Sequence, residues 1–141
     1  MKPPFYEVVD HTADFAFRVT APDLPGLVRA AVLAVVDAAW DLGTLRPGAA
    51  VRHATLPADD GAMAIFLALS EVLFLADAHG LVPADATVVP DGTGGLSMTF
   101  ACDRLDPDRH RHRIAFKAAT LHGLAVRPGG AGLQATVLMD T

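Results

Sequence analysis

Apolar residues recur along the chain with two different spacings, and each spacing predicts one type of secondary structure. In residues 15–20, bulky apolar side chains alternate with smaller or polar ones: Phe15, Phe17 and Val19 with Ala16, Arg18 and Thr20. A period of two is typical of a strand with one buried face. Residues 6–9 predict a further extended segment just before it.

A helical spacing follows after residue 22. Asp23 is a predicted N-cap, and Pro25 fits the first turn because proline lacks an N–H that would be unpaired there anyway. Apolar residues then recur every three or four positions as far as Trp40, and Gly43 is the predicted end. Arg29 and Asp37 are expected on the solvent side of this helix.

A second helix is predicted over residues 61–79, with Asp59 or Asp60 as its cap and Gly80 as its end. It is apolar almost all round, which predicts that both of its sides are covered. Its most apolar run, residues 62–76, is shorter than the ~20 residues of a membrane span. We therefore interpret it as a buried helix.

The second half of the chain has the patterns of strands and turns. Glycine-rich connections separate the apolar runs, as in hairpins. The predicted strands are residues 51–56, 86–89, 96–102, 114–121, 124–127 and 133–139. Two helices followed mainly by strands predict an α+β fold, a mostly antiparallel sheet with both helices packed on one face. Residues 1–141 are predicted to form a single domain.

Composition restricts the possible functions. The chain has 52% hydrophobic and 19% charged residues, typical of a globular protein, and a net charge of −5. This charge opposes broad nucleic-acid binding, which needs a basic surface. A single cysteine, Cys102, and no signal-like segment in residues 1–5 predict a cytoplasmic protein that does not enter a membrane.

The sequence offers three candidate sites, of which Cys102 and a basic run are the two weaker ones. Cys102 lies in phase with apolar residues of its strand, which favours a buried structural thiol over a nucleophile. The run "RHRHR", residues 109–113, offers His110 and His112 as a metal pair if it is extended, or as solvated loop residues. We favour the solvated interpretation, with contact to an acidic partner or nucleic acid as a secondary one.

The strongest candidate is an acidic cluster, "DHTADF", at residues 10–15. Asp10 has an alternative role, in which its side chain hydrogen-bonds to the backbone of the turn. His11 has one as well, as a packed, hydrogen-bonded histidine. Asp14 is harder to explain, because an unpaired carboxylate before a half-buried strand is costly if buried. If the first and last strands are neighbours, Asp14, Asp140 and Thr141 meet at one edge, where their oxygens suit Ca²⁺ or Mg²⁺.

Five segments together resemble the archease family. They are "DHTADF" at residues 10–15, "SEVLFLADAHGLV" at 70–82, "LDPDRHR" at 105–111, "KAATLHGLAV" at 117–126 and "LMDT" at 138–141. Their order and spacing match across essentially the whole chain. The sequence departs from the family pattern at Phe15 and Ala16, where Ile-Gly is frequent, and at Leu121, where tyrosine is common.

The resemblance implies an SHS2-like core, in the order strand–helix–strand–strand, and a role as protein cofactor rather than enzyme. Archeases activate the tRNA-splicing RNA ligase, which joins 2′,3′-cyclic phosphate and 5′-hydroxyl RNA ends. They promote its guanylylation and multiple turnover and broaden its nucleotide use. The ligase, with GTP and a divalent metal of its own, is thus the expected partner. Contact with RNA is expected only indirectly, through the ligase.

The resemblance also implies a set of site residues. Asp14, Asp140 and Thr141 correspond to a metal site in which calcium is expected. Lys117, the only lysine besides Lys2, corresponds to a motif lysine needed for activation. His11 and His122 match motif positions as well.

Two competing functions use the same residues. A small metal-dependent phosphoesterase would combine the carboxylates with His11 as a general base. An RNA-binding module would use "RHRHR", although the acidic charge and a single tryptophan and tyrosine argue against it.

Overall fold

The strands of the protein divide into two sheets that share one central helix. The computed structural model describes residues 5–9 and 15–141. Its strands are β1 (Tyr6–Val9), β2 (Phe15–Ala21), β3 (Ala50–Pro57), β4 (Leu81–Pro90), β5 (Gly95–Arg104), β6 (Ala118–Ala119), β7 (Val126–Gly129) and β8 (Gly132–Asp140). The helices are α1 (Leu24–Trp40), α2 (Gly61–His79) and a 3₁₀ turn, η1 (Leu42–Thr44).

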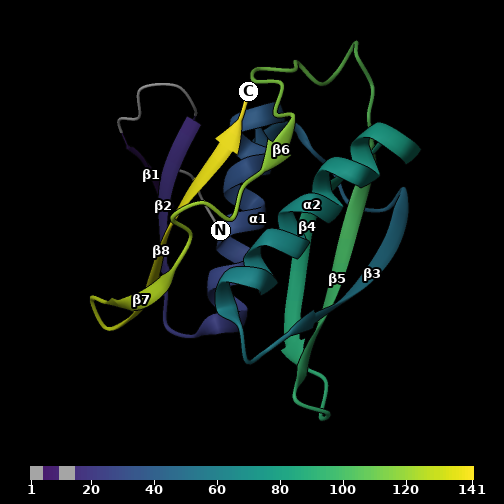
Figure 1. Ribbon diagram of the computed structural model, residues 1–141. Coiled ribbons are helices and arrows are strands. Elements are labelled where there is room, and N and C mark those ends of the chain that lie inside the picture. Colours follow the sequence, from purple (N-terminus) through teal and green to yellow (C-terminus); the bar gives the residue numbers. More distant parts are fainter. Residues whose placement is uncertain (1–4, 10–14) are drawn as a thin grey trace.

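Both sheets are antiparallel (Figure 1). The larger runs β1-β2-β8, and the far side of β8 pairs with β6 toward one end and with β7 toward the other. The smaller runs β3-β5-β4. The α+β class and the antiparallel pairing are confirmed, but the expected single sheet is wrong. Residues 50–104 alone, β3-α2-β4-β5, have the strand–helix–strand–strand order.

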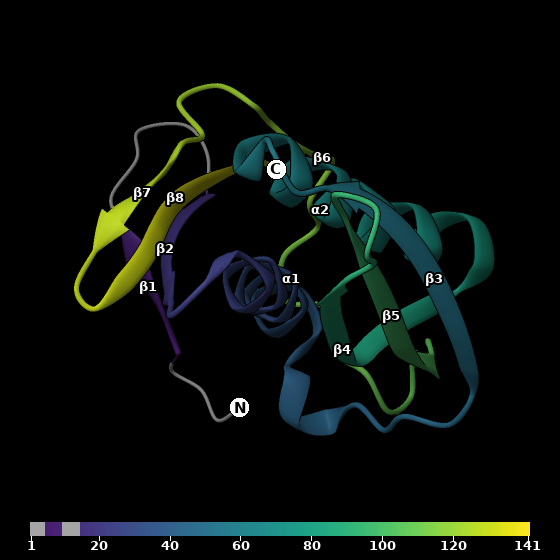
Figure 2. The same ribbon diagram turned by 90° about the horizontal axis from the view of Figure 1, so that it is seen from below.

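Helix α1 lies between the two sheets, as Figure 2 shows from below. It contacts β2 and β8 of the larger sheet, β4 of the smaller one, and α2. Thirteen of its 17 residues are buried, so the helix has almost no solvent side. The expectation that Asp37 faces solvent is therefore wrong, since this side chain is only 7% exposed.

Hydrogen bonds explain how Asp37 is tolerated in the interior. Its carboxylate accepts from the Tyr6 hydroxyl at 2.9 Å and from the Leu42 N–H at 3.0 Å. Burial and this bond to Asp37 raise the pKa of Tyr6 above its ordinary value. Arg29 is partly buried and donates to the Ala86 carbonyl and to Asp85. These polar side chains of α1 are thus hydrogen-bonded within the protein instead of facing solvent.

Helix α2 packs on one side only. The helix contacts α1, β3, β4 and β6, and its buried residues are Ala64, Ile65, Ala68, Leu69, Val72 and Leu75. The other side leaves Leu67 39% and Phe74 52% exposed, so the expected coverage of both sides is wrong. Among the described residues, α2 is the one helix long and apolar enough to cross a membrane by length and composition.

The helix ends follow the predicted capping. Asp23 accepts from the Gly26 N–H at 2.9 Å, and Asp60 from the Met63 N–H at 3.1 Å. Gly80 ends α2 with φ of 63°, a conformation in which glycine carries no Cβ penalty. Helix α1 instead ends at Trp40 with Asp41 as its C-cap, two residues before the predicted Gly43.

The strands predicted over residues 114–121 and 124–127 are shorter in the structure. Only β6 and β7 form there, and residues 105–117 lie outside any strand. The strand predicted over residues 86–89 is longer, since β4 begins already at Leu81, and the other predicted strands are confirmed to within two residues at each end.

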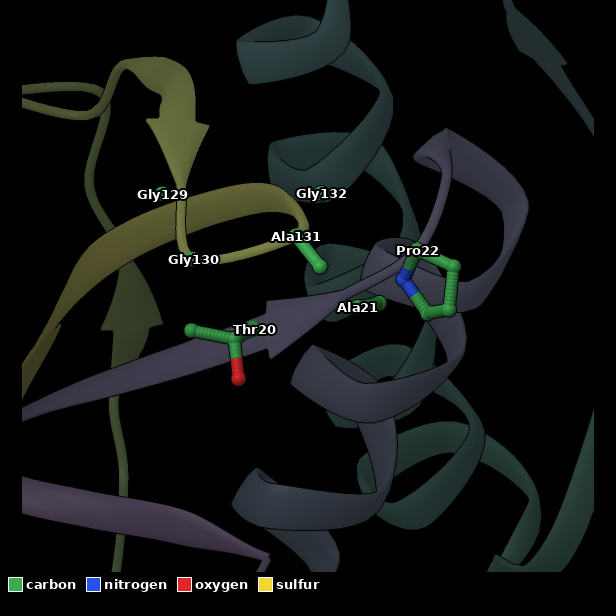
Figure 3. Close-up of a pocket in the computed structure, with 7 residues that line it drawn as sticks. All are labelled: Thr20, Ala21, Pro22, Gly129, Gly130, Ala131 and Gly132. Carbon is green, nitrogen blue, oxygen red and sulfur yellow. The ribbon is translucent and has the colours of Figure 1, made fainter.

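A hollow of about 350 Å³ opens where β2 runs into α1 and the β7–β8 hairpin turns (Figure 3). It is lined by Thr20, Ala21, Pro22 and residues 129–132, and threonine is the only polar side chain among them. The close approach of the hairpin to β2 requires glycine. A Cβ on Gly132 would collide with the Ala21 carbonyl oxygen, which is backbone and cannot rotate away.

We predict that Gly132→Ala lowers the free energy of unfolding by about 2–3 kcal/mol, the usual cost of overpacking. Gly43→Ala is the matched control, because its Cβ would meet only Asp41 Oδ1, at 3.5 Å. Urea denaturation of both variants measures the difference. Equal stabilities would contradict the close approach of the hairpin to β2.

Candidate site at the end of the β2-β8-β6 sheet

Asp140 is the last residue of β8 and lies on its outward face. Ala135, Val137 and Met139 are buried, and the alternation puts Asp140 on the opposite side, where it is exposed. Thr141 follows it and is exposed as well. The predicted parity of Asp140 is confirmed.

Two other motif segments flank this end of β8. On one side, Phe15 of β2 pairs with Met139. On the other, Ala118 of β6 pairs with Asp140, and the Lys117 N–H donates to the Asp140 carbonyl at 2.8 Å. The start of β2, the start of β6 and the end of β8 therefore lie side by side (Figure 1).

Aromatic packing joins the two flanking segments beneath the site. The rings of Phe15 and Phe116 have centroids 5.5 Å apart, and Phe15 also packs near Phe17 at 6.2 Å. Phe116 directly precedes Lys117, whose side chain is exposed. The segment that carries the lysine is thus fixed to β2 by side chains and to β8 by backbone.

His122 lies in a tight turn after β6. The Leu124 N–H donates to the Leu121 carbonyl at 3.1 Å, and Gly123 has φ of 68°, which favours glycine. The His122 N–H donates to Thr120 Oγ1 at 3.0 Å, and its side chain is exposed. Leu121, the residue that departs from the family pattern, is 42% exposed.

The remaining predicted site residues, Asp10, His11 and Asp14, lie outside the described residues. Within residues 5–9 and 15–141, no group of three or more His, Cys, Asp or Glu side chains is arranged to hold a metal ion. The structure therefore brings together Lys117, Asp140 and Thr141, and the metal site stays a prediction.

A second polar cluster, which the sequence did not predict, lies at the end of β5 and in the loop that follows it. Asp103 is 4% exposed and His110 also 4%. Asp103 Oδ2 accepts from the Arg46 N–H at 2.8 Å and faces His110 Nε2 at 3.1 Å, and Oδ1 accepts from Arg109 at 2.9 Å. His110 Nδ1 accepts from the Asp106 N–H, so its Nε2 carries the donated hydrogen.

These contacts correct the interpretation of "RHRHR". His110 is buried and hydrogen-bonded rather than solvated, while His112 is exposed and stacks on Trp40 with ring centroids 5.2 Å apart and planes at 7°. The two imidazole rings thus have separate partners, which does not fit the alternative that His110 and His112 bind one metal ion together. No periodicity marks this loop, so the sequence carries no signal for the burial of His110.

Electrostatics at Asp103 follow from the same contacts. Burial alone would raise the pKa of this carboxyl group, but the hydrogen bonds from Arg46 and Arg109 outweigh burial and hold it below its ordinary value. Cys102, the preceding residue, is fully buried, and burial raises the pKa of its thiol. The prediction of a structural cysteine is confirmed.

Comparison with known proteins gives the family. The model of the archease protein family matches residues 6–141. The chain belongs to the archease family. Among curated archeases, a probable archease of Mycobacterium tuberculosis is 31% identical over 132 residues, which is 94% of this chain and 72% of that protein. An archease of Methanopyrus kandleri is 31% identical over 126 residues, with 86% and 88% covered.

Two solved structures share the archease fold. Protein 1598 of Methanobacterium thermoautotrophicum has a TM-score of 0.73 and 22% identity, with 97% of this chain and 99% of that one covered. An archease of Thermotoga maritima, described as a possible chaperone, has a TM-score of 0.66 and 21% identity, with 100% and 98% covered. At these identities the likeness concerns the fold.

We predict that Asp103→Asn destabilises the protein by about 2–4 kcal/mol at pH 7, because buried donors lose a charged acceptor. The depressed pKa of Asp103 also makes the native protein sensitive to acid. Its contribution is complete above the unfolded value of about 3.9 and is lost as the pH falls below that value.

Urea denaturation at pH 7, 4 and 3 measures both effects. The variant should lose less stability than the wild type between pH 4 and pH 3. The same loss in both proteins would show that Asp103 is not the group that titrates.

Proposed function

We propose that this archease is an accessory activator of the tRNA-splicing RNA ligase, which joins 3′-phosphate and 5′-hydroxyl RNA ends. It promotes guanylylation and multiple turnover of the ligase and carries out no ligation itself. Family membership supports this role. The observation that carries it is the meeting of three motif segments at one end of the β2-β8-β6 sheet.

The proposed metal site consists of Asp14, Asp140 and Thr141, with calcium as the expected ion. Asp14 immediately precedes Phe15 in the sequence, and Asp140 immediately follows Met139. Because Phe15 and Met139 are paired, the pairing supports a common ligand set. Hard carboxylate and carbonyl oxygens are the ligands that Ca²⁺ prefers, and the ion would offset the repulsion between the carboxylates.

Lys117, His11 and His122 are the proposed contacts with the ligase. The hydrogen bond between Lys117 and Asp140 keeps the lysine backbone beside the proposed metal ligands. An ammonium group there suits a phosphate of the ligase-bound nucleotide or a ligase carboxylate. Metal ions assist nucleotidyl transfer by neutralising developing charge, so a site pressed against the ligase's GTP and metal centre would help guanylylation.

The proposed setting is the cytoplasm, with the ligase as the protein partner and RNA bound by the ligase. A net charge of −5 supports the indirect role of RNA, because a nucleic-acid surface is basic.

We predict that Asp140→Ala lowers activation of ligase guanylylation about tenfold or more, since loss of a metal-site group typically costs at least this factor. The assay measures transfer of labelled GMP to the host's own ligase with and without the archease. Asp59→Ala, an exposed carboxylate before α2, is the matched control and should activate fully. Full activation by Asp140→Ala would contradict the site.

Lys117 is tested by a conservative change. Arginine keeps the charge but alters the shape and donor geometry, so Lys117→Arg should lose most of the activation if the ammonium group is bound specifically. Wild-type activity of this variant would mean that charge alone matters. Turnover of phosphoesters by the archease without any ligase would instead favour the phosphoesterase function.

A further inference from the structure

An aspartate with a strained backbone conformation caps the C-terminal end of α1. Asp41 has φ of 64° and ψ of 93°, and among the described residues it is the one non-glycine residue with positive φ. Glycine adopts this region without a steric penalty, whereas a side chain does so at a cost. The sequence even provides Gly43 two residues later. Something other than helix termination therefore favours a carboxylate at position 41.

The Asp41 side chain has two partners. Oδ1 accepts from the Gly43 N–H at 3.2 Å, and Oδ2 contacts the Arg113 guanidinium at 2.8 Å. The first bond is local and an asparagine would keep it. The second joins α1 to a residue 72 positions later in the sequence, in the segment without strands that ends at Lys117.

The ion pair belongs to a set of contacts that fasten this segment to the end of α1. The Arg113 N–H donates to the Ala39 carbonyl at 2.7 Å, and the neighbouring His112 stacks on Trp40. Three residues beyond Arg113, Phe116 packs on Phe15, and the Lys117 N–H reaches Asp140. Among the described residues, the last hydrogen bond and ion pair between this segment and the end of α1 before Lys117 are therefore those of Arg113.

The contribution of the Asp41–Arg113 ion pair to the stability of the fold gives little reason for its presence. Its side chains are 47% and 38% exposed, and half-exposed ion pairs contribute little because water screens them. A weak surface contact does not explain a strained backbone. We propose that Asp41 is a positioning residue that, through Arg113, holds Lys117 in place beside Asp140. Its consequence for ligase activation rests on the proposed function.

Asp41→Asn tests this assignment, because it keeps the Gly43 bond and tolerates positive φ but removes the charge. The Lys117 amide reports its own hydrogen bond to Asp140 through hydrogen exchange. We expect exchange at Lys117 to become two- to fivefold faster. Exchange at Leu105, whose N–H donates to the Gly80 carbonyl at the other end of the segment, should stay unchanged.

Glu7→Gln is the matched control variant. It removes the charge from another exposed ion pair, between Glu7 and Arg18 at 3.2 Å, which lies on β1 and β2. Neither the exchange at Lys117 nor the ligase activation should change. Arg113→Gln, in contrast, should reproduce the effects of Asp41→Asn. Equal acceleration at Lys117 and Leu105 would indicate general loosening and overturn the proposal.

The guanylylation assay then links position to function. We expect Asp41→Asn to lose two- to fivefold in activation, parallel to the faster exchange at Lys117. If Asp41→Asn changes the exchange rate at Lys117 by less than twofold, the positioning role is overturned, whatever the ligase activation. Faster exchange with full activation overturns the link to function. If the wild type itself does not activate the ligase, the proposed function fails, and the exchange measurement alone decides the role of Asp41.

Discussion

The pairing of β8 with β2 and β6 is the constraint on which the candidate site depends. Seven residue pairs join β2 to β8, and they align Phe15 with Met139, whose side chain is fully buried. A shift by one residue would turn every side chain of β8 to the opposite face and bury Asp140. The core beneath the sheet thus fixes the register, and the register fixes which carboxylate reaches the surface.

The sequence predicted the elements well because periodicity and capping are local properties. Asp23, Asp60 and Gly80 bound the helices as expected, and the alternation in β8 placed Asp140 correctly. The division of the strands into two sheets was not predictable in this way. It depends on which faces meet in space, and a helix with two covered sides, such as α1, looks the same in sequence wherever its partners lie.

The polar residues were predicted less well, and for a common reason. Asp37 and His110 were expected at the surface because charged and loop residues usually lie there. Both are buried and hydrogen-bonded. Asp37 has its partner Tyr6 far away in the sequence, and His110, in a loop without periodicity, has Asp103. A hydrogen bond that compensates for burial has no signature in a single sequence. The resemblance to archeases supplied candidate site residues that periodicity alone could not give.

The exposure of the candidate site bears on the kind of partner it suits. Lys117, Asp140, Thr141 and His122 are all exposed, and Asp140 lies on the face of β8 opposite its buried residues. Small-molecule sites are usually concave and apolar. The hollow of about 350 Å³ lies at the opposite end of β2 and β8, and small residues with little chemistry line it. Exposed polar groups that strand pairing holds at one end of a sheet suit contact with a macromolecular surface, as the proposed function requires.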